Sequence, residues 1–154
     1  MSEVDQSEPA TSGQAPPGVT VTKTLKDGIE WISYRPAEKR HETPILFQHG
    51  MWHAAWCWQG WQEALAQQGW ESHAISLPGH GGSPAQGSVR FATMGRYLEV
   101  LKHQVAQLPS KPVLIGHSMG GALIQWYLKK VADDLPAAVL VASWTSHSTW
   151  ADGS

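Results

Sequence analysis

The chain has 154 residues, of which 42% are hydrophobic and 16% charged, the balance of a globular domain with a buried core. Its net charge of −2 gives no electrostatic argument for nucleic acid or an anionic membrane as a partner. The hydrophobic runs are too short to span a bilayer and the N-terminus lacks the features of a secretory signal, so we expect no membrane partner and a cytoplasmic protein.

The first predicted elements are a polar tail and a hairpin. Residues 1–18 have no aromatic side chain and are rich in Ser, Gln, Glu and Pro, which is typical of a disordered tail. Residues 19–23 and 29–36 are rich in β-branched and aromatic residues, and the "LKDG" between them favours a turn, so we expect an antiparallel hairpin. The hairpin begins a single domain that we assign to residues 19–154.

After the hairpin, strand and helix patterns alternate. Strands are predicted in 44–50, 113–118 and 136–144, and 71–84 is predicted to be a strand that runs into a Gly/Pro loop; helices are predicted in 56–70, 93–108 and 119–131. In the first helix Trp58, Trp61 and Leu65 recur on one face, and we place Trp61 and Trp126 in the core. Such alternation predicts an α/β fold with a mostly parallel sheet and helices on both of its faces.

The segment "GHSMG" puts Ser118 between Gly116 and Gly120, where a hydrophobic strand runs into a helix. In that context Gly-x-Ser-x-Gly is typical of a nucleophile elbow, a strained turn that exposes a serine hydroxyl at the carboxyl end of a sheet. The alternative is an ordinary Gly/Ser turn. We interpret Ser118 as a catalytic nucleophile.

A second segment is expected at the same edge of the sheet. "FQHGMW" ends the first parallel strand, and a backbone amide just after its glycine can face the serine. We predict an oxyanion hole formed by two backbone N–H groups, that of Met119 and that of Met51, with Trp52 as the alternative to Met51. Trp52 and Trp56 follow on the same loop and are candidates for the lining of a substrate pocket, the alternative being that they belong to the core.

The segments "PILFQHGMWHAAWCWQGW", "ISLPGHGGSP" and "VLIGHSMGGALIQWYL" resemble the α/β-hydrolase fold family, in the family's order and over roughly residues 19–145. The texture of the first segment is similar to the branch of esterases, lysophospholipases and hydroxynitrile lyases. The resemblance implies an eight-stranded, mostly parallel sheet, a Ser–acid–His triad, a small-molecule ester or acyl substrate and no cofactor. The sequence has no metal-ligand spacing such as HExxH, and we expect no metal.

The sequence departs from the family where the rest of the triad is expected. The family places an acid and then a histidine after the serine. Here the only histidine after Ser118 is His147, and the one acid close to it is Asp152. They are weak candidates for base and acid, the alternative being that they belong to a polar tail. Counted with the hairpin, the chain supplies six strands, so we expect an incomplete α/β-hydrolase fold, truncated after the sixth.

Two hypotheses follow for function. The first is a serine hydrolase of carboxylic esters or related acyl substrates, impaired because the triad acid and histidine are missing. The alternative is a non-catalytic fragment or interaction module with the same half-fold. In either case the strand in 136–144 is an apolar sheet edge, through which we expect self-association.

Overall fold

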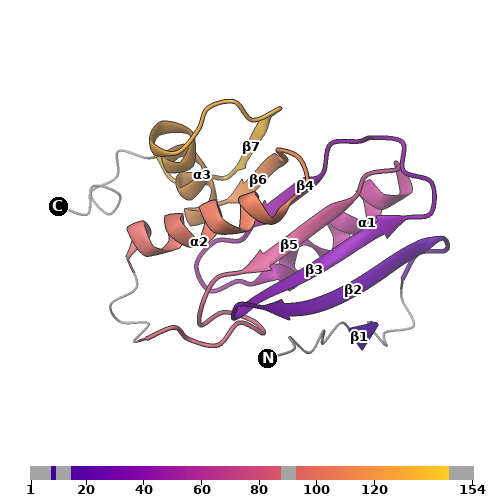
Figure 1. The fold of residues 1–154 in the computed structure, drawn as a ribbon, viewed down its shortest axis with the longest axis horizontal. Helices are drawn as coiled ribbons and strands as arrows, with labels where there is room; N and C mark the ends of the chain where they lie inside the picture. The colour runs from indigo at the N-terminus through magenta and orange to yellow at the C-terminus, as the bar shows by residue number, and fades with distance from the viewer. Residues whose placement is uncertain (1–7, 10–14, 88–92, 146–154) are drawn as a thin grey trace.

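The computed structural model describes residues 8–9, 15–87 and 93–145, which form one mixed sheet flanked by helices (Figure 1). The sheet has seven strands in the order β1-β2-β3-β5-β4-β6-β7. The strands are β1 (Glu8–Pro9), β2 (Val19–Lys26), β3 (Ile29–Pro36), β4 (Ile45–Gln48), β5 (Ser72–Ser76), β6 (Val113–His117) and β7 (Ala138–Val141). The helices are η1 (Ala55–Trp58), α1 (Gln59–Gln67), α2 (Met94–Gln107) and α3 (Met119–Lys130).

The N-terminal hairpin is confirmed. Strands β2 and β3 pair antiparallel and are joined by Asp27 and Gly28, which have φ of 51° and 75°. Two residues with positive φ form the tight turn whose twist suits a hairpin, and Asp-Gly is a favoured pair for it. The two-residue strand β1 pairs with β2, so Glu8–Pro9 extends the sheet by one short strand.

The parallel part of the sheet is also confirmed. Strand β4 lies between β5 and β6 and is parallel to both, and β7 is parallel to β6. Helices cover both faces, with α2 and α3 on the near side in Figure 1 and α1 on the far side. Two hydrophobic clusters fill the two interfaces, one around Leu101 of α2 and Leu123 of α3, the other around Trp58 and Ala66. The carboxyl ends of β4, β5 and β6 therefore meet at one edge of the sheet.

The predicted inner face of the first helix is wrong in one respect. Trp61 is 44% exposed, and the residues that α1 buries are Gln62 and Ala66. Gln62 is fully buried, and its Nε2 donates to the backbone O of Ile32 and to Oγ of Ser72. These hydrogen bonds satisfy the buried Nε2 of Gln62, whereas its Oε1 has no partner among the described residues. They attach this face of α1 to β3 and β5, and Trp61 lies at the rim. The core prediction for Trp126, which is 7% exposed, is confirmed.

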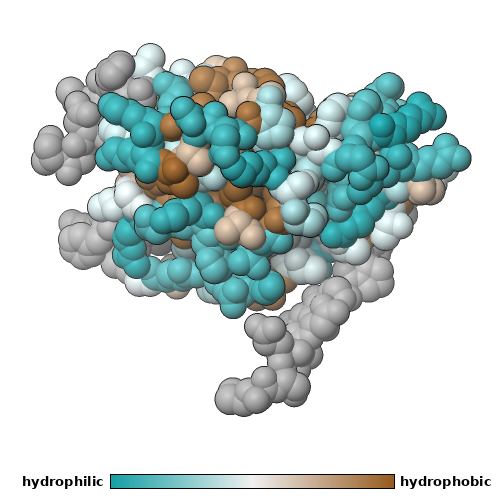
Figure 2. Space-filling view, turned by 45° about the horizontal axis from the view of Figure 1, so that its top comes forward, coloured by the Kyte–Doolittle hydropathy of each residue, from teal (hydrophilic) through white to brown (hydrophobic). Residues whose placement is uncertain are grey.

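Strand β7 is an edge of the sheet as far as the described residues extend. Its side chains are unusually open, with Val139 40% and Leu140 44% exposed. In Figure 2 hydrophobic residues gather at the upper edge of the view, on the side where Figure 1 places α3 and β7. Among the helices of the described ranges, none has both the length and the hydrophobicity of a membrane span.

Candidate active site

Ser118 lies on a sharp turn between β6 and α3, where the sequence predicts it. Its φ is 53° and its ψ −118°, a combination that costs a residue with a side chain free energy and is seldom adopted without a reason. The turn is fixed on both sides, because the N–H of Ser118 donates to the O of Val141 and its O accepts from the N–H of Trp144. The side chain is half-buried. The fold thus holds a strained serine at the carboxyl end of the sheet.

The two glycines around Ser118 are required by close backbone packing. A Cβ on Gly116 would stand 2.6 Å from the backbone O of Gly120, and one on Gly120 would stand 2.6 Å from the backbone O of His49 and closer still to that of Gln48. Real Cβ atoms do not approach an oxygen so closely. The first turn of α3 therefore packs directly onto the end of β4, which brings the loop after β4 to the serine.

The start of α3 offers backbone donors at the same place. The amides of Gly121 and Ala122 donate to the O of Ser118. The amide of Met119 precedes them in the first turn, among the helix-start donors that have no acceptor within the helix. Met119 is 3% exposed, so its side chain anchors this turn in the core. The geometry of the turn suits a role for the Met119 amide as an oxyanion donor.

The loop after β4 reaches Ser118 through Gly50. A Cβ on Gly50 would lie 3.0 Å from Cβ of Ser118 and 2.9 Å from the backbone O of His117. Met51 follows with 38% of its side chain exposed, and Trp52 is 89% exposed with φ of 65°. The residue predicted as the first oxyanion donor is thus the direct neighbour of a glycine that touches the elbow.

Aromatic rings continue from the elbow along this loop. The rings of His117 and His53 are 5.6 Å apart between centroids, and those of His53 and Trp56 are 5.9 Å apart. Trp56 is 58% exposed, so neither it nor Trp52 belongs to the core. His53 was not singled out by the sequence. Its place beside His117 depends on the approach of two loops that are distant in the chain.

His49 is held as a structural residue. It is fully buried, its Nε2 accepts from the backbone N–H of Leu77 at 2.9 Å, and its Nδ1 lies 2.7 Å from the O of Gly50. Because Nε2 accepts, the proton of the neutral ring is on Nδ1, which donates to Gly50. Burial lowers the pKa of His49 to about 4. With both nitrogens engaged, His49 joins the ends of β4 and β5 and is not available as a base.

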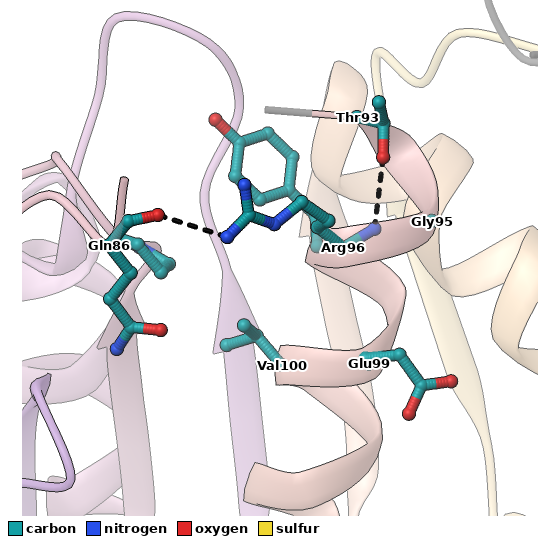
Figure 3. Close-up of a pocket in the computed structure, with 8 residues that line it drawn as sticks. Gln86, Thr93, Gly95, Arg96, Glu99 and Val100 are labelled. Atoms are coloured by element: carbon teal, nitrogen blue, oxygen red, sulfur yellow. Dashed lines mark hydrogen bonds between the residues drawn. The ribbon is translucent and has the colours of Figure 1, made fainter. Parts of the chain in front are cut away.

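A cavity of about 470 Å³ opens beside the loop after β5 and the start of α2 (Figure 3). Pro78, Gln86, Arg96, Tyr97 and Val100 are among its lining residues. The Arg96 guanidinium donates to the backbone O of Gln86 at 3.1 Å, and Thr93 Oγ accepts from the Arg96 N–H, as expected of the N-cap of α2. Ser118 is not among the residues that line this cavity, so the cavity is separate from the proposed site around Ser118.

The remaining predicted site residues are not placed. His147 and Asp152 lie outside the described residues. Within the described ranges, no hydrogen bond joins a histidine ring to the Ser118 hydroxyl, and no cluster of three His, Cys, Asp or Glu side chains is arranged to hold a metal ion. The structure thus brings Gly50 and the first turn of α3 to Ser118, and Met51, Trp52 and Trp56 follow Gly50 along the chain.

Comparisons with known proteins agree with this architecture. The family model of the alpha/beta hydrolase fold matches residues 43–153. Over 117 residues the chain is 29% identical to Methylesterase 2 of Arabidopsis thaliana, covering 73% of this chain and 44% of that protein. It is 31% identical to Esterase PIR7B of Oryza sativa subsp. japonica over 110 residues, which are 70% of this chain and 40% of that protein.

A solved structure shows the same fold. The thioesterase domain of the curacin biosynthetic pathway superposes with a TM-score of 0.65 at 24% identity, covering 92% of this chain and 47% of that domain. The chain spans less than half the length of each of these three proteins. The match to the family model extends over most of the sequence and includes both the β4 loop and the serine elbow. This chain is therefore a member of the α/β-hydrolase fold family.

Proposed function

We propose that the protein hydrolyses carboxylic esters or related acyl substrates, with Ser118 as nucleophile. The observation that supports this most is the strained φ of Ser118 at a turn against which Gly50 packs. Strain at a residue with a side chain persists where the surroundings hold it in place, and such residues cluster at active sites. The relatives described as esterases support the same class of reaction.

The reaction begins with attack of the Ser118 hydroxyl oxygen on the substrate carbonyl while a base takes the hydroxyl proton. The negative charge that develops on the carbonyl oxygen is stabilised by the N–H groups of Met51 and Met119, and the N–H of Trp52 is the alternative to that of Met51. Each such donor is worth about 3 kcal/mol in the transition state. Collapse of the intermediate expels the alcohol, and water then releases the acid from the acyl-enzyme.

The reaction needs a histidine as general base. His49 is excluded because both of its ring nitrogens are engaged. His117 precedes Ser118 at the end of β6, and we assign it a packing role because its ring packs against that of His53. His147, with Asp152 as its acid, is the first pair to test. An elbow without its base keeps roughly 10³–10⁴-fold catalysis over water, so the proposed activity is weak if this pair does not act.

The substrate is proposed to be a small-molecule ester whose apolar part lies against Trp52 and Trp56. Trp52 is exposed on the loop that approaches Ser118, and Trp56 is exposed on η1, which follows this loop. Aromatic side chains beside a few convergent polar groups are typical of small-molecule sites. The surface they form would determine how well an acyl or aromatic group is bound.

The experiment is hydrolysis of a short-chain p-nitrophenyl ester by the purified chain, with Ser118→Ala as control. We expect turnover above background that disappears in Ser118→Ala, together with covalent labelling of Ser118 by a fluorophosphonate. Identical rates in the two proteins would refute the proposal. If turnover is present, His147→Gln tests the base, and unchanged turnover in that variant would exclude His147.

A second candidate function is an interaction module, favoured by the open edge at β7. Val139 and Leu140 are each at least 40% exposed there, and an apolar edge strand is a template for pairing with another chain. The proposed partner is a second copy of this chain. Light scattering should show self-association that Leu140→Lys reduces, whereas a concentration-independent monomer would exclude this candidate.

A further inference from the structure

We propose that Glu30 is a positioning residue for the oxyanion loop, which we define as residues 50–55, and that it acts through the hydroxyl of Ser76. This inference rests on the proposed function, since a positioned loop matters to chemistry only if Ser118 reacts. Glu30 lies near the start of β3, in the N-terminal hairpin, and pairs in register with Ser76 at the end of β5. Among the described residues, neither Glu30 nor Ser76 is hydrogen-bonded to Ser118.

The hydroxyl of Ser76 links the Glu30 carboxylate to the oxyanion loop through two hydrogen bonds. It donates to Oε1 of Glu30 at 2.8 Å and accepts from the backbone N–H of Ala55 at 3.0 Å. Ser76 and Ala55 are both fully buried. A serine hydroxyl has one hydrogen to donate. Because this hydrogen is donated to the Glu30 carboxylate, a lone pair of the hydroxyl oxygen is free to accept from the N–H of Ala55. A hydrogen bond to an ionised acceptor is also stronger than one between neutral groups.

Ser83, on the loop after β5, is hydrogen-bonded to the same two residues. Its hydroxyl accepts from the backbone N–H of Glu30 at 2.8 Å and donates to the backbone O of Ser76 at 2.6 Å. Ser83 is 3% exposed. Both the backbone and the side chain of Glu30, which is half-buried, therefore take part in one network, and this fixes the direction of the carboxylate.

Gly81 packs directly against the network of Glu30 and Ser76. Its φ is 50°, and a Cβ there would stand 2.8 Å from Cβ of Ala54, 2.8 Å from Oγ of Ser76 and 2.9 Å from Oε1 of Glu30. Only a residue without a side chain fits this space. The loop after β5 thus packs onto both ends of the Glu30–Ser76 hydrogen bond and onto the oxyanion loop.

The consequence is that both ends of the oxyanion loop are held by the end of β5. At one end the ring of His49 accepts from the N–H of Leu77 and donates to the O of Gly50. At the other end Ala55 is held by Ser76. Met51, the proposed donor, lies between these two anchors. Misplacement of a catalytic group by about 1 Å can cost 10²-fold in rate, so loss of one anchor should be measurable.

The test compares Glu30→Ala, Glu30→Gln and Glu71→Ala. Glutamine keeps an oxygen that can accept from Ser76, whereas alanine does not. Glu71 is the matched control because it is a carboxylate at the opposite end of the same pair of strands, where it contacts Arg35 and His73. Removing it affects the β3–β5 pair without touching Ser76 or the oxyanion loop.

Two readouts separate positioning from general damage. The first is hydrogen exchange at the Ala55 amide, which we expect to become at least about tenfold faster in Glu30→Ala and to stay near the wild-type rate in Glu30→Gln and Glu71→Ala. The second is the kinetics of ester hydrolysis, in which we expect kcat to fall about tenfold in Glu30→Ala with KM unchanged. Ser76→Ala should have the same effects, and the double variant should add little to either.

The results of these experiments distinguish a failure of the Glu30 anchor from a failure of the proposed hydrolase activity. Wild-type protein that does not turn over ester, with Ala55 exchange that responds only to Glu30→Ala and Ser76→Ala, would support the anchor and refute the hydrolase. Equal exchange at Ala55 in Glu30→Ala and Glu71→Ala would overturn the inference whatever the activity. Faster exchange with an unaltered kcat would also overturn it, because the loop would then not need this anchor for catalysis.

Discussion

Gly50 and Ser118 are in direct contact across two strand ends, since a Cβ on Gly50 would stand 3.0 Å from Cβ of Ser118. The contact joins the loop after β4 to the turn after β6. It is possible because Gly50 has no side chain and because Gly120 lets α3 approach the end of β4. The same contact brings the loop that carries Met51 to the serine, and the proposed oxyanion hole depends on it.

Gly50→Ala should therefore impair the site more than the fold. The added methyl would meet the backbone O of His117 at 2.9 Å, which neither backbone can avoid without moving. We expect ester turnover and fluorophosphonate labelling of Ser118 to fall by at least about tenfold, as the loop moves away from the elbow. Steady-state kinetics and mass spectrometry of the labelled protein measure these effects.

The control is Gly60→Ala in α1, where a Cβ would meet nothing within 4 Å. Alanine is the better helix former by up to about 1 kcal/mol, so this variant should be as stable as the wild type or more stable, with unchanged turnover. If Gly50→Ala retained full activity, the contact between the two loops would have no role in the reaction.

Ser118→Gly should stabilise the protein relative to Ser118→Ala although neither variant has a nucleophile. Alanine keeps the Cβ that is strained at φ of 53°, whereas glycine adopts this conformation freely. We expect a difference of about 1 kcal/mol in the free energy of unfolding, measured by urea denaturation. The comparison of Ser110→Gly with Ser110→Ala, at a position without positive φ, should have the opposite sign.

Trp56→Ala tests the proposed substrate pocket. Trp56 is connected to the elbow through the rings of His53 and His117. We expect KM for an ester with a long or aromatic acyl group to rise about tenfold and kcat to change little, because binding to this surface precedes the chemical step. Trp61→Ala is the matched control, since Trp61 is also exposed but lies on α1. Equal changes in the two variants would place the substrate elsewhere.

The sequence was informative where a local pattern determines the structure. Asp27-Gly28 predicted the hairpin because that pair suits a two-residue turn. Gly116 and Gly120 predicted the elbow because only glycines permit the packing of β6, α3 and the end of β4. The continuous hydrophobic run of β6 predicted a strand buried on both faces.

The sequence could not predict features that depend on distant partners. Periodicity placed Trp61 in the core, whereas the hydrogen bonds of Gln62 to β3 and β5 determine which face of α1 is buried. The hydrogen bond between Glu30 and Ser76 depends on the pairing of β3 with β5. The two residues are 46 positions apart in the sequence. Nothing in the local pattern around Glu30 distinguishes it from a solvated carboxylate.

The last prediction concerns acid stability, which two buried histidines should control. Burial lowers the pKa of His49 and of His73 to about 4, in the latter case against the attraction of Glu71. In the unfolded chain both rings take up a proton near pH 6.5, so between pH 6.5 and 4 the unfolded state binds more protons than the folded state. The free energy of unfolding should therefore be highest above pH 6.5 and fall as the pH is lowered, by about 2 kcal/mol per ring between pH 7 and 5.

Urea denaturation of the wild type, His73→Asn and His103→Gln at pH 7 and pH 5 measures this effect. His73 is 4% exposed, whereas the His103 side chain is 58% exposed on α2. His73→Asn should be less stable at pH 7, because the hydrogen bond between the ring and Ser33 is lost, and it should lose about 2 kcal/mol less than the wild type on going to pH 5. His103→Gln should follow the wild type. The same loss in all three proteins would mean that the buried rings do not control the acid response, and that the carboxylates do, since their protonation acts in the lower part of the same pH range.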